Sequence, residues 1–295
     1  MKKVAIIIPT YNAANFIEKA IDSVFAQSYS DYEIIVVDDG STDNTKEILE
    51  KYGNRITYIL QSNQGVAIAR NTGIRNSESE YIAFLDSDDQ WLPEKLERQM
   101  EILENNIDTS MVHTNDIRIS EKGKALYIDS PKIKYLSGKI SKYLLLRKAS
   151  IKTSTVLLRR ECLDKVGLFD SCLSRLGVED RDLWIRFTKY YNAYYIDKLL
   201  VKYLVRSNSM SHNTKKMVAG RYYVIDKYYP KKKGLNIQRQ KMLSAIHFEI
   251  ADGLSWQDHP QKALHEYWIA CKYFPFNITM CKNITKTAIK CLLSG

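Results

Sequence analysis

Residues 32–40 read YEIIVVDDG, a run of four β-branched apolar side chains that ends in two aspartates and a glycine. Continuous runs of this kind, each followed by a stretch with helical periodicity, are typical of strands in a mostly parallel sheet covered by helices on both faces. Three further stretches within the first 115 residues share the pattern: KKVAIIIP at 2–9, ITYILQS at 56–62 and YIAFLDSDD at 81–89. This part of the chain therefore predicts a βαβ architecture.

The rest of the chain divides at about residue 212. Between residues 153 and 206 the sequence predicts a short strand, STVLLRR, two helices and a strand, YYIDKLLVKYLV, which complete the first domain. Beyond residue 212 only helical stretches follow, among them two antiparallel helices joined at 258–260. We therefore expect an α/β domain over residues 1–212 and a basic helical region over residues 213–295.

The net charge of +10 is distributed unevenly along the 295 residues. Residues 1–130 hold 13 basic and 22 acidic side chains, whereas residues 131–295 hold 31 basic and 12 acidic ones. A basic half suits nucleic acid, an anionic membrane face or a phosphorylated substrate. No helix-turn-helix, RNA-recognition or zinc pattern supports nucleic-acid binding, so we expect no nucleic-acid partner. A basic nucleic-acid-binding protein or a non-catalytic scaffold is the alternative function.

We expect a cytoplasmic protein. The N-terminal apolar run, residues 4–8, is too short for a signal-peptide core, and no window approaches the roughly 18–20 apolar residues that span a bilayer. The five cysteines include no closely spaced pair, which argues against a zinc site or a disulfide framework.

Polar residues follow the predicted strands at their carboxyl ends, which is where ligands bind in an open parallel sheet. The four places are Pro9–Asn12, Asp38–Ser41, Gly65–Gly73 and Asp86–Asp89. The last place holds three carboxylates in four residues, and like charges this close repel one another. A hard divalent cation such as Mg²⁺ or Mn²⁺ offsets the repulsion and binds diphosphate oxygens as well. The alternative is a solvated turn in which Asp88 or Asp89 caps the helix near Pro93.

The other candidate positions also have structural alternatives. The pair Asp38 and Asp39 suits a ribose or base contact, but equally a turn before a helix. Tyr11 could stack on a nucleobase or pack, and Arg70 could pair with a phosphate or with the aspartates. The acidic residues of Gly177–Trp184 are stabilised by the helix dipole, and one of them could also act as a general base.

In this order and spacing the motifs resemble the family 2 glycosyltransferases, which have the GT-A fold. The resemblance covers residues 2–211 and rests on five segments: IIIPTYN, EIIVVDDGSTDNT, GVAIARNTGI, YIAFLDSDD and GVEDRDLWIRF. It implies an α/β, GT-A type, mostly parallel sheet sandwiched by helices, with residues 213–295 as a C-terminal helical extension. It also implies an inverting, metal-dependent glycosyltransferase of the hexosyltransferase type that uses Mg²⁺ or Mn²⁺.

The resemblance implies a nucleotide-sugar site at the strand ends. Thr10, Tyr11 and Asn12 would line the nucleobase pocket, with Asp39 hydrogen-bonding the base or ribose and Arg70 nearby. The donor would be a nucleotide-diphosphate sugar, a UDP-sugar first. The acceptor would be a hydroxyl on a glycan or a lipid-linked molecule, in the assembly of cell-surface polysaccharide or glycolipid.

The D-x-D motif of the family matches Asp86-Ser87-Asp88. The resemblance makes Asp88 the direct metal ligand, with Asp86 and Ser87 on the nucleotide sugar and Asp89 as a second candidate ligand.

Asp180 matches the catalytic base, and Glu179 and Trp184 would contact the acceptor or support the site. A single displacement by the acceptor oxygen inverts the configuration at the anomeric carbon. Family members often carry Tyr-Arg-x-His-x-x-Ser after the last strand, whereas residues 203–211 read YLVRSNSMS. Arg206 therefore stands where histidine is common, and we expect it to pair with diphosphate oxygens.

The end of the chain predicts one more helix, Cys281–Leu293. Lys282, Lys286 and Lys290 fall on one stripe, with the apolar side chains largely elsewhere, as in helices that lie in a membrane interface. Packing on the protein is the alternative. We favour weak peripheral contact with the inner face of the cell membrane.

Overall fold

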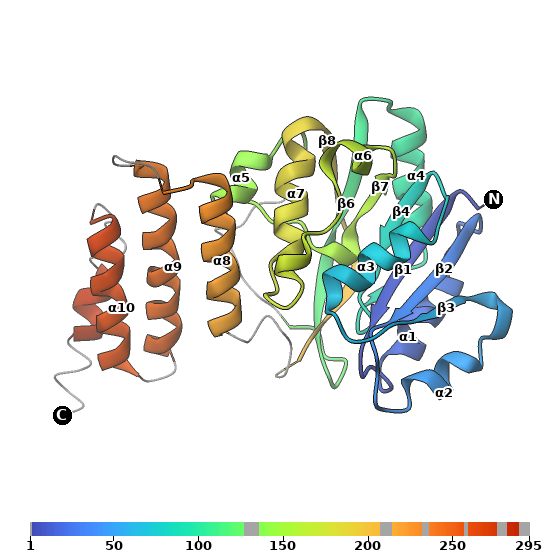
Figure 1. Ribbon diagram of the computed structural model, residues 1–295, viewed down its shortest axis with the longest axis horizontal. Coiled ribbons are helices and arrows are strands. Elements are labelled where there is room, and N and C mark those ends of the chain that lie inside the picture. The colour runs from blue at the N-terminus through green and yellow to red at the C-terminus, as the bar shows by residue number, and fades with distance from the viewer. Residues whose placement is uncertain are drawn as a thin grey trace. The chain divides into compact units, whose positions relative to one another are not determined.

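The computed structural model describes residues 2–126, 136–206, 214–231, 236–256, 259–275 and 282–288. The chain divides into two compact units, Met1–Ser209 and Met210–Gly295. The boundary predicted at residue 212 falls in the stretch 207–213, outside the described residues, and stays a prediction. The first unit combines a sheet with helices, and the second unit is helical where it is described (Figure 1).

A single mixed sheet organises the described part of the first unit. Its strands are β1 Val4–Thr10, β2 Tyr32–Asp38, β3 Thr57–Leu60, β4 Tyr81–Phe84, β5 Gln90–Trp91, β6 Thr109–Ser120, β7 Leu157–Arg159 and β8 Asn192–Val205. They lie in the order β3-β2-β1-β4-β7-β6-β8-β5. The pairs β1–β2, β1–β4, β2–β3 and β6–β8 are parallel, whereas β7 and β5 pair with their neighbours in antiparallel fashion. The predicted mostly parallel α/β sheet is confirmed.

Helices and short 3₁₀ turns connect the strands. The helices of this unit are α1 Ile17–Phe25, α2 Thr45–Glu50, α3 Val66–Arg75, α4 Lys95–Asn105, α5 Ser141–Leu145, α6 Cys162–Val166 and α7 Glu179–Tyr190. The 3₁₀ turns are η1 Gly53–Arg55, η2 Thr153–Thr155 and η3 Ser171–Leu173. The sequence did not predict β5, β6 or α5. Strand β6 was missed because it includes the polar run His113–Asp116, which lacks the apolar pattern of a buried strand.

Both faces of β1 are covered, which explains why all seven of its residues are buried. Val4, Ile6 and Ile8 join a core cluster with α1 and α4 on one face. Ile7 points to the other face, toward α3. A Cβ at Gly73 would lie 2.5 Å from Ile7 Cγ2, so only glycine lets α3 pack this closely on the strand. The sheet is therefore sandwiched between helices, as predicted.

The second unit consists of α8 Thr214–Tyr228, α9 Ile237–Trp256 and α10 Pro260–Tyr273, and residues 282–288 are also helical. Ala251 of α9 packs with Ala263, Tyr267 and Ala270 of α10 in one core cluster. The prediction of helices without strands is confirmed for the described residues. Across the stretches that the structure describes, no helix is both long enough and apolar enough to cross a membrane.

Candidate active site

The predicted nucleotide residues meet where β1 and β2 end. Asp39 is buried, its amide donates to the Thr10 carbonyl, and its carboxylate accepts hydrogen bonds from three groups of the loop after β3. These donors are Gln61 Nε2 at 2.7 Å, the Gln64 amide at 2.9 Å and the Gly65 amide at 2.7 Å. Asp39 therefore shapes the loop that leads into α3.

The neighbouring Thr10, Tyr11 and Asn12 differ in exposure and bonding. Thr10 is buried, and its hydroxyl has no hydrogen-bond partner among the described residues. Tyr11 is 50% exposed, so its ring is available to a base. Asn12 adopts a positive φ of 49° and links two loops, since its amide donates to Ser41 Oγ and its side chain accepts from the Thr42 amide. Asn12 thus joins the loops that follow β1 and β2, and its contact with a base stays a prediction.

Helix α3 brings Arg70 into the site, and its start is fixed by a close backbone approach. Gly65 has φ +94°, and a Cβ there would lie 2.7 Å from the Ser174 carbonyl oxygen. Ser174 Oγ in turn accepts hydrogen bonds from the amides of Ala67 and Ile68 in the first turn of α3. This local geometry explains the glycine that opens the GVAIARNTGI segment.

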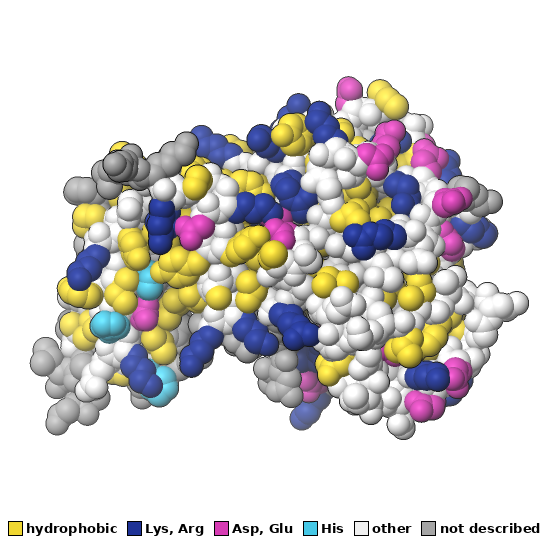
Figure 2. All heavy atoms as spheres, viewed as in Figure 1, with side chains coloured by type: hydrophobic (Ala, Val, Ile, Leu, Met, Phe, Trp, Pro, Cys, Tyr) yellow, Lys and Arg dark blue, Asp and Glu magenta, His cyan; other side chains and the backbone are white. Residues whose placement is uncertain are grey.

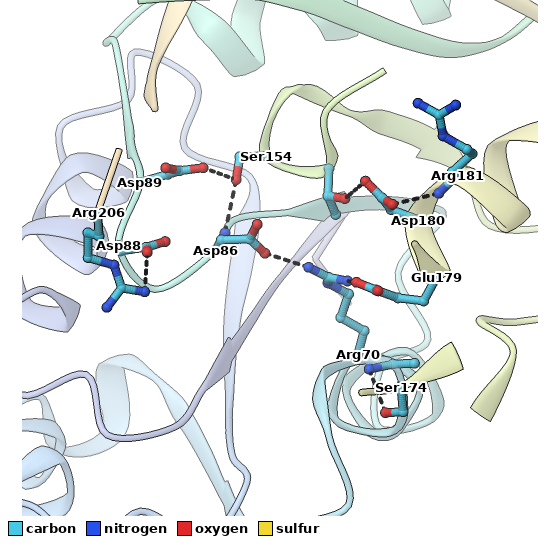
Figure 3. A network of polar contacts seen from close by, with 12 residues as sticks. Arg70, Asp86, Asp88, Asp89, Ser154, Ser174, Glu179, Asp180, Arg181 and Arg206 are labelled. Carbon is cyan, nitrogen blue, oxygen red and sulfur yellow. Dashed lines mark hydrogen bonds and ion pairs between the residues drawn. The ribbon is translucent and has the colours of Figure 1, made fainter. Parts of the chain in front are cut away.

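Arg70 joins two acidic groups that are far apart in the sequence (Figure 3). Its guanidinium donates to Asp86 Oδ1 at 2.7 Å and to Glu179 Oε1 at 2.6 Å. Burial lowers the pKa of Arg70, but the carboxylates of Asp86 and Glu179 more than offset this and raise it above its usual value. Arg70 stays charged and bridges the end of β4 to the start of α7.

The carboxylates after β4 are each engaged in a different contact. Asp88 Oδ2 lies 2.6 Å from the Arg206 guanidinium, and Ser87 is half-buried. Asp89 is 1% exposed; Ser154 Oγ donates to its Oδ2 at 2.5 Å and the Leu204 amide to its Oδ1 at 3.0 Å. Ser154 Oγ also accepts from the Asp86 amide at 3.1 Å. The buried Asp89 is thus linked through Ser154 to the backbone of Asp86.

The local electrostatics favour an added positive charge. Burial raises the pKa of Asp88, and Asp86 raises it further, while Arg206 opposes both effects. Burial raises the pKa of Asp89 well above its usual value, with Asp88 and Asp86 adding to the effect. Carboxylates that raise one another's pKa are a favourable place for a cation.

Glu179 and Asp180 lie in the first turn of α7. Burial raises the pKa of Glu179 to about 7 despite the opposing charge of Arg70. Its Oε2 is buried without a hydrogen-bond partner among the described residues. Burial also raises the pKa of Asp180; its carboxylate accepts from the Arg181 amide at 2.6 Å and from Thr153 Oγ1 at 3.4 Å. Raised carboxyl pKa values are common in groups that accept protons in catalysis.

Tyr203 shows that the two ends of the candidate site share one environment. Burial raises the pKa of its phenol, and the carboxylates of Asp89, Asp86, Asp88 and Asp180 each raise it further. The contacts of the adjacent residues Thr153 with Asp180 and Ser154 with Asp89 place the Asp86–Asp89 cluster and Asp180 in one region of the structure. Tyr203 opens the YLVRSNSMS segment, but no sequence signal predicts a role for its side chain.

Two further features of the site, η2 and the lysine before it, were not predicted from the sequence. Lys152 contacts Asp116 Oδ2 at 2.6 Å and lies 3.8 Å from the centre of the Tyr203 ring. Thr153 contacts Asp180, and Ser154 contacts Asp89 and Asp86, so consecutive residues hold both ends of the site. The sequence KTST at 152–155 contains no recognisable motif. Its role depends on contacts with residues that lie 27–68 positions away in the chain.

Trp184, predicted as an acceptor contact or as support, is fully buried. Its ring packs against Phe84 and Phe169 at centroid distances of 6.1 and 6.0 Å. This position allows support of α7 and excludes direct contact with an acceptor.

Asp86 and Asp88 are the partly exposed carboxylates of the cluster, and they are the residues that would hold a divalent cation. Their side chains are 32% and 17% exposed, and an ion of this type takes its remaining ligands from water and phosphate oxygens. The described residues include no group of three or more His, Cys, Asp or Glu side chains that could hold a metal by itself. Because Asp89 is buried and doubly hydrogen-bonded, a direct metal contact by Asp89 is less well supported than one by Asp88.

A cavity of about 440 Å³ borders the Asp88 side of the site. Phe16 and Lys19 line it from the region of α1, and Leu204 lines it from β8. Arg206 lies 4.8 Å from the centre of the Phe16 ring, so the same ring contributes to both the cavity and the Arg206 position.

Comparison with known protein families shows to which family the chain belongs. Residues 5–167 match the model described as Glycosyl transferase family 2. The chain belongs to glycosyltransferase family 2. The match includes the β1, β2, α3 and β4 segments that form one side of the candidate site, whereas Asp180 and Arg206 lie beyond it.

Curated relatives are glycosyltransferases by name. An uncharacterized glycosyltransferase of Rickettsia typhi is 39% identical over 203 residues, which are 68% of this chain and 63% of that protein. TuaG of Bacillus subtilis is 32% identical over 229 residues, 75% of this chain and 86% of that protein; its name proposes teichuronic acid biosynthesis. This family 2 chain thus spans less than two thirds of the Rickettsia relative's length.

Solved structures share the fold of this family 2 chain. S. aureus TarS residues 1–349 in complex with UDP-GlcNAc match with a TM-score of 0.62 and 19% identity, over 92% of this chain and 81% of that chain. The mannosyltransferase PcManGT from Pyrobaculum calidifontis, in complex with GDP-Man and Mn²⁺, matches with a TM-score of 0.61 and 18% identity, over 99% and 81%. The predicted GT-A type fold is confirmed.

Proposed function

We propose that this protein transfers a sugar from a nucleotide-diphosphate donor to a hydroxyl acceptor, with inversion at the anomeric carbon. The observation that carries the proposal is the ion-pair chain Asp86–Arg70–Glu179, which joins the D-x-D segment to the turn that holds Asp180. It supports a donor site and a proton acceptor in one location. Family 2 membership supports the same class of reaction.

The donor is a nucleotide-diphosphate sugar, and a UDP-sugar is our first choice. Structural neighbours are complexes with UDP-GlcNAc and with GDP-Man, which supports the class of donor. Tyr11 offers a half-exposed ring for the base, and Arg206 offers a guanidinium for the diphosphate. Asp86, held by Arg70, would contact the nucleotide sugar.

Asp180 is the proposed catalytic base. It accepts the proton of the acceptor hydroxyl as the oxygen forms its bond to the anomeric carbon, while the bond from that carbon to the diphosphate breaks. The diphosphate leaves with the electron pair, and one displacement inverts the configuration. Glu179 supports this step indirectly by holding Arg70, and Thr153 helps orient the Asp180 carboxylate.

Asp88, with Asp86, would hold Mg²⁺ or Mn²⁺, and the PcManGT complex with Mn²⁺ supports this choice of ion. A bound divalent cation would supply charge stabilisation for the departing diphosphate. Arg206 adds a second positive charge at the same place.

We propose a glycan or lipid-linked acceptor in cell-surface polysaccharide assembly, which the name of the relative TuaG supports. The cytoplasmic location expected from the sequence stays a prediction, and cell fractionation would check it.

The test is a transfer assay with UDP-, GDP- and dTDP-sugars in the presence of Mg²⁺ or Mn²⁺, after a thermal-shift screen for the stabilising donor. Asp180→Asn should lower turnover by about 10²- to 10⁴-fold while donor affinity stays near that of the wild type. Asp164→Asn, an exposed acid on α6, is the matched control and should retain full activity. Equal turnover in the Asp180→Asn variant would refute the role of the base.

A further inference from the structure

The net positive charge of this protein lies almost entirely in its second unit. Residues 210–295 contain 14 basic and 5 acidic side chains, a balance of +9, whereas residues 1–209 contain 30 and 29, a balance of +1. An 86-residue unit therefore holds nearly all of the net charge of +10. A concentration of charge of this size attracts an anionic partner.

The described acidic side chains of this unit are used internally. Asp226 pairs with Arg239 at 2.5 Å, and Glu249 pairs with Arg221 at 3.1 Å. Glu266 lies 2.6 Å from His247 Nδ1, and Asp252 accepts hydrogen bonds from Tyr267 and Asn283. Seven exposed lysines have no carboxylate partner within the part of the chain that the structure describes: Lys215, Lys231, Lys241, Lys262, Lys272, Lys282 and Lys286.

The chemistry of these cations indicates what kind of anion they suit. Arg221 and Arg239, the arginines among the described residues of the unit, are paired internally, so the exposed cations are lysines. Arginine recognises single phosphates through a planar fork, whereas lysine acts as a mobile point charge. Dispersed lysines suit a surface of many anionic groups rather than one fixed phosphate.

Aromatic and basic side chains of α9, α10 and the residue after α10 form two groups of contacts, which together we name the α9–α10 patch. Its members are Lys241, His265, Trp268, Lys272 and Phe274. Trp268 is 54% exposed; Lys272 Nζ lies 3.5 Å from its ring centre, and His265 stacks on it at 6.1 Å. Lys241 Nζ lies 5.0 Å from the centre of the Phe274 ring, which connects α9 to the end of α10. Figure 2 shows basic and hydrophobic side chains intermixed over this unit, at the left of the view.

The helical segment 282–288 exposes lysines to solvent, whereas its isoleucine packs against the protein. Ile284 packs against the cluster of α9 and α10, Asn283 donates to Asp252, and Thr287 contacts Ser255. Lys282 and Lys286 are exposed, one turn apart. The described part of the predicted interfacial helix thus packs on the protein, and its exposed residues are Lys282, Thr285 and Lys286. Residues 281 and 289–293 of that prediction lie outside the described residues.

We infer that the second unit docks on an anionic lipid bilayer through the α9–α10 patch, with the other unpaired lysines adding long-range attraction. Each lysine near such a surface contributes to binding, and a tryptophan beside lysines is typical of the membrane–water interface. Ile237, 53% exposed and one turn before Lys241 on α9, is a second apolar contact. This docking does not depend on the proposed transferase reaction.

The same residues fit a lipid surface better than a soluble polyanion. The Trp268 ring is 54% exposed and lies beside Lys272 and His265, so an apolar ring and cationic groups are presented together, as suits the boundary between lipid headgroups and acyl chains. An exposed isoleucine gains nothing from a hydrated polymer, whereas it gains apolar burial in a bilayer interface. The bilayer therefore accounts for both the charge and the exposed apolar side chains.

Flotation of the full chain with vesicles tests the inference. Vesicles with 30% phosphatidylglycerol should retain the protein at low salt, and pure phosphatidylcholine vesicles should not. The double variant Lys241→Gln/Lys272→Gln should lower the partition coefficient about 25-fold, since each lysine contributes about fivefold. The double variant Lys51→Gln/Lys142→Gln removes two exposed lysines of the first unit and should change it much less.

Trp268 gives a readout that charge alone would not move. Brominated lipids should quench the tryptophan fluorescence of the wild type, and Trp268→Phe should remove most of that quenching. Equal loss in both lysine double variants, or no preference for anionic vesicles, would overturn the proposal. So would binding to polyglutamate or duplex RNA that matches vesicle binding at equal salt, because the partner would then be a generic polyanion.

Discussion

The guanidinium of Arg206 lies 2.6 Å from the carboxylate of Asp88, the residue proposed to hold the divalent ion. Arg206 follows β8, whereas Asp88 follows β4, so the tertiary fold brings the cation of one segment to the proposed metal ligand of another. A metal ion that binds Asp88 must compete with this ion pair. Diphosphate, which accepts hydrogen bonds from arginine, would relieve the competition by drawing Arg206 away.

Arg206→Gln should therefore separate the binding of metal from the binding of nucleotide. We expect the variant to bind Mn²⁺ alone more tightly than the wild type, and UDP about 10- to 100-fold more weakly, because a charge-assisted hydrogen bond is lost. Titration calorimetry with Mn²⁺, with UDP and with both measures this coupling. Arg206→Lys keeps the charge and should show intermediate values. Unchanged UDP affinity in Arg206→Gln would contradict the role of Arg206.

Transfer activity should fall on the acid side at a higher pH than an ordinary aspartate would cause. Burial raises the pKa of Asp180, and a base works only when it is deprotonated, so the rate falls as the pH drops through that raised pKa. Burial raises the pKa of the neighbouring Glu179 to about 7. As the pH falls, Glu179 therefore becomes protonated and its ion pair with Arg70 weakens. The measurement is kcat/KM from pH 4 to pH 8 at constant ionic strength. A rate that stays constant down to pH 4 would contradict this assignment.

Ser154→Ala should damage both stability and donor binding. The substitution removes the donor to the buried Asp89 Oδ2 and the acceptor of the Asp86 amide. Leaving such groups unpaired costs about 1–3 kcal/mol in the free energy of unfolding. Denaturant unfolding and UDP titration with Mn²⁺ measure the two effects. Ser171→Ala, at an exposed position in η3, is the control, and a Ser154→Ala protein as stable as this control would show that the contacts are unimportant.

Lys95→Met should stabilise the protein. Lys95 is fully buried; its ammonium contacts Gln99 Oε1 at 2.6 Å and lies 3.9 Å from the centre of the Trp91 ring. Burial lowers the pKa of Lys95 well below its usual value, so the unfolded state binds the proton more readily and wild-type stability rises with pH toward 10.5. Methionine removes this cost.

We expect a gain of about 1–3 kcal/mol at pH 7 from Lys95→Met, which shrinks toward pH 10. Thermal unfolding of both proteins at several pH values measures it. A variant that is less stable at every pH would show that the contact with Gln99 outweighs the cost of burying the amine.

The local sequence pattern predicted the sheet and the polar residues at its strand ends, because each of these signals lies within one segment of the chain. The apolar runs before Asp39 and Asp86 predict buried parallel strands, and parallel strands carry their following residues to one edge of the sheet. Arg70 was predicted near Asp39, and the structure shows that its guanidinium pairs with Asp86 and Glu179. The glycines at 65 and 73 belong to the same segment and meet their partners only in the fold.

The sequence by itself thus determined the fold class, the family and the strand-end residues. Only the tertiary structure decided that Arg206 forms an ion pair with Asp88 and that Ser154 connects Asp86 to Asp89. It also decided that Trp184 is buried and that Ile284 of residues 282–288 packs against α9 and α10. The physical reason is range: periodicity and turn chemistry act over a few residues, whereas these contacts join groups up to 118 positions apart, whose burial and pairing depend on the folded chain.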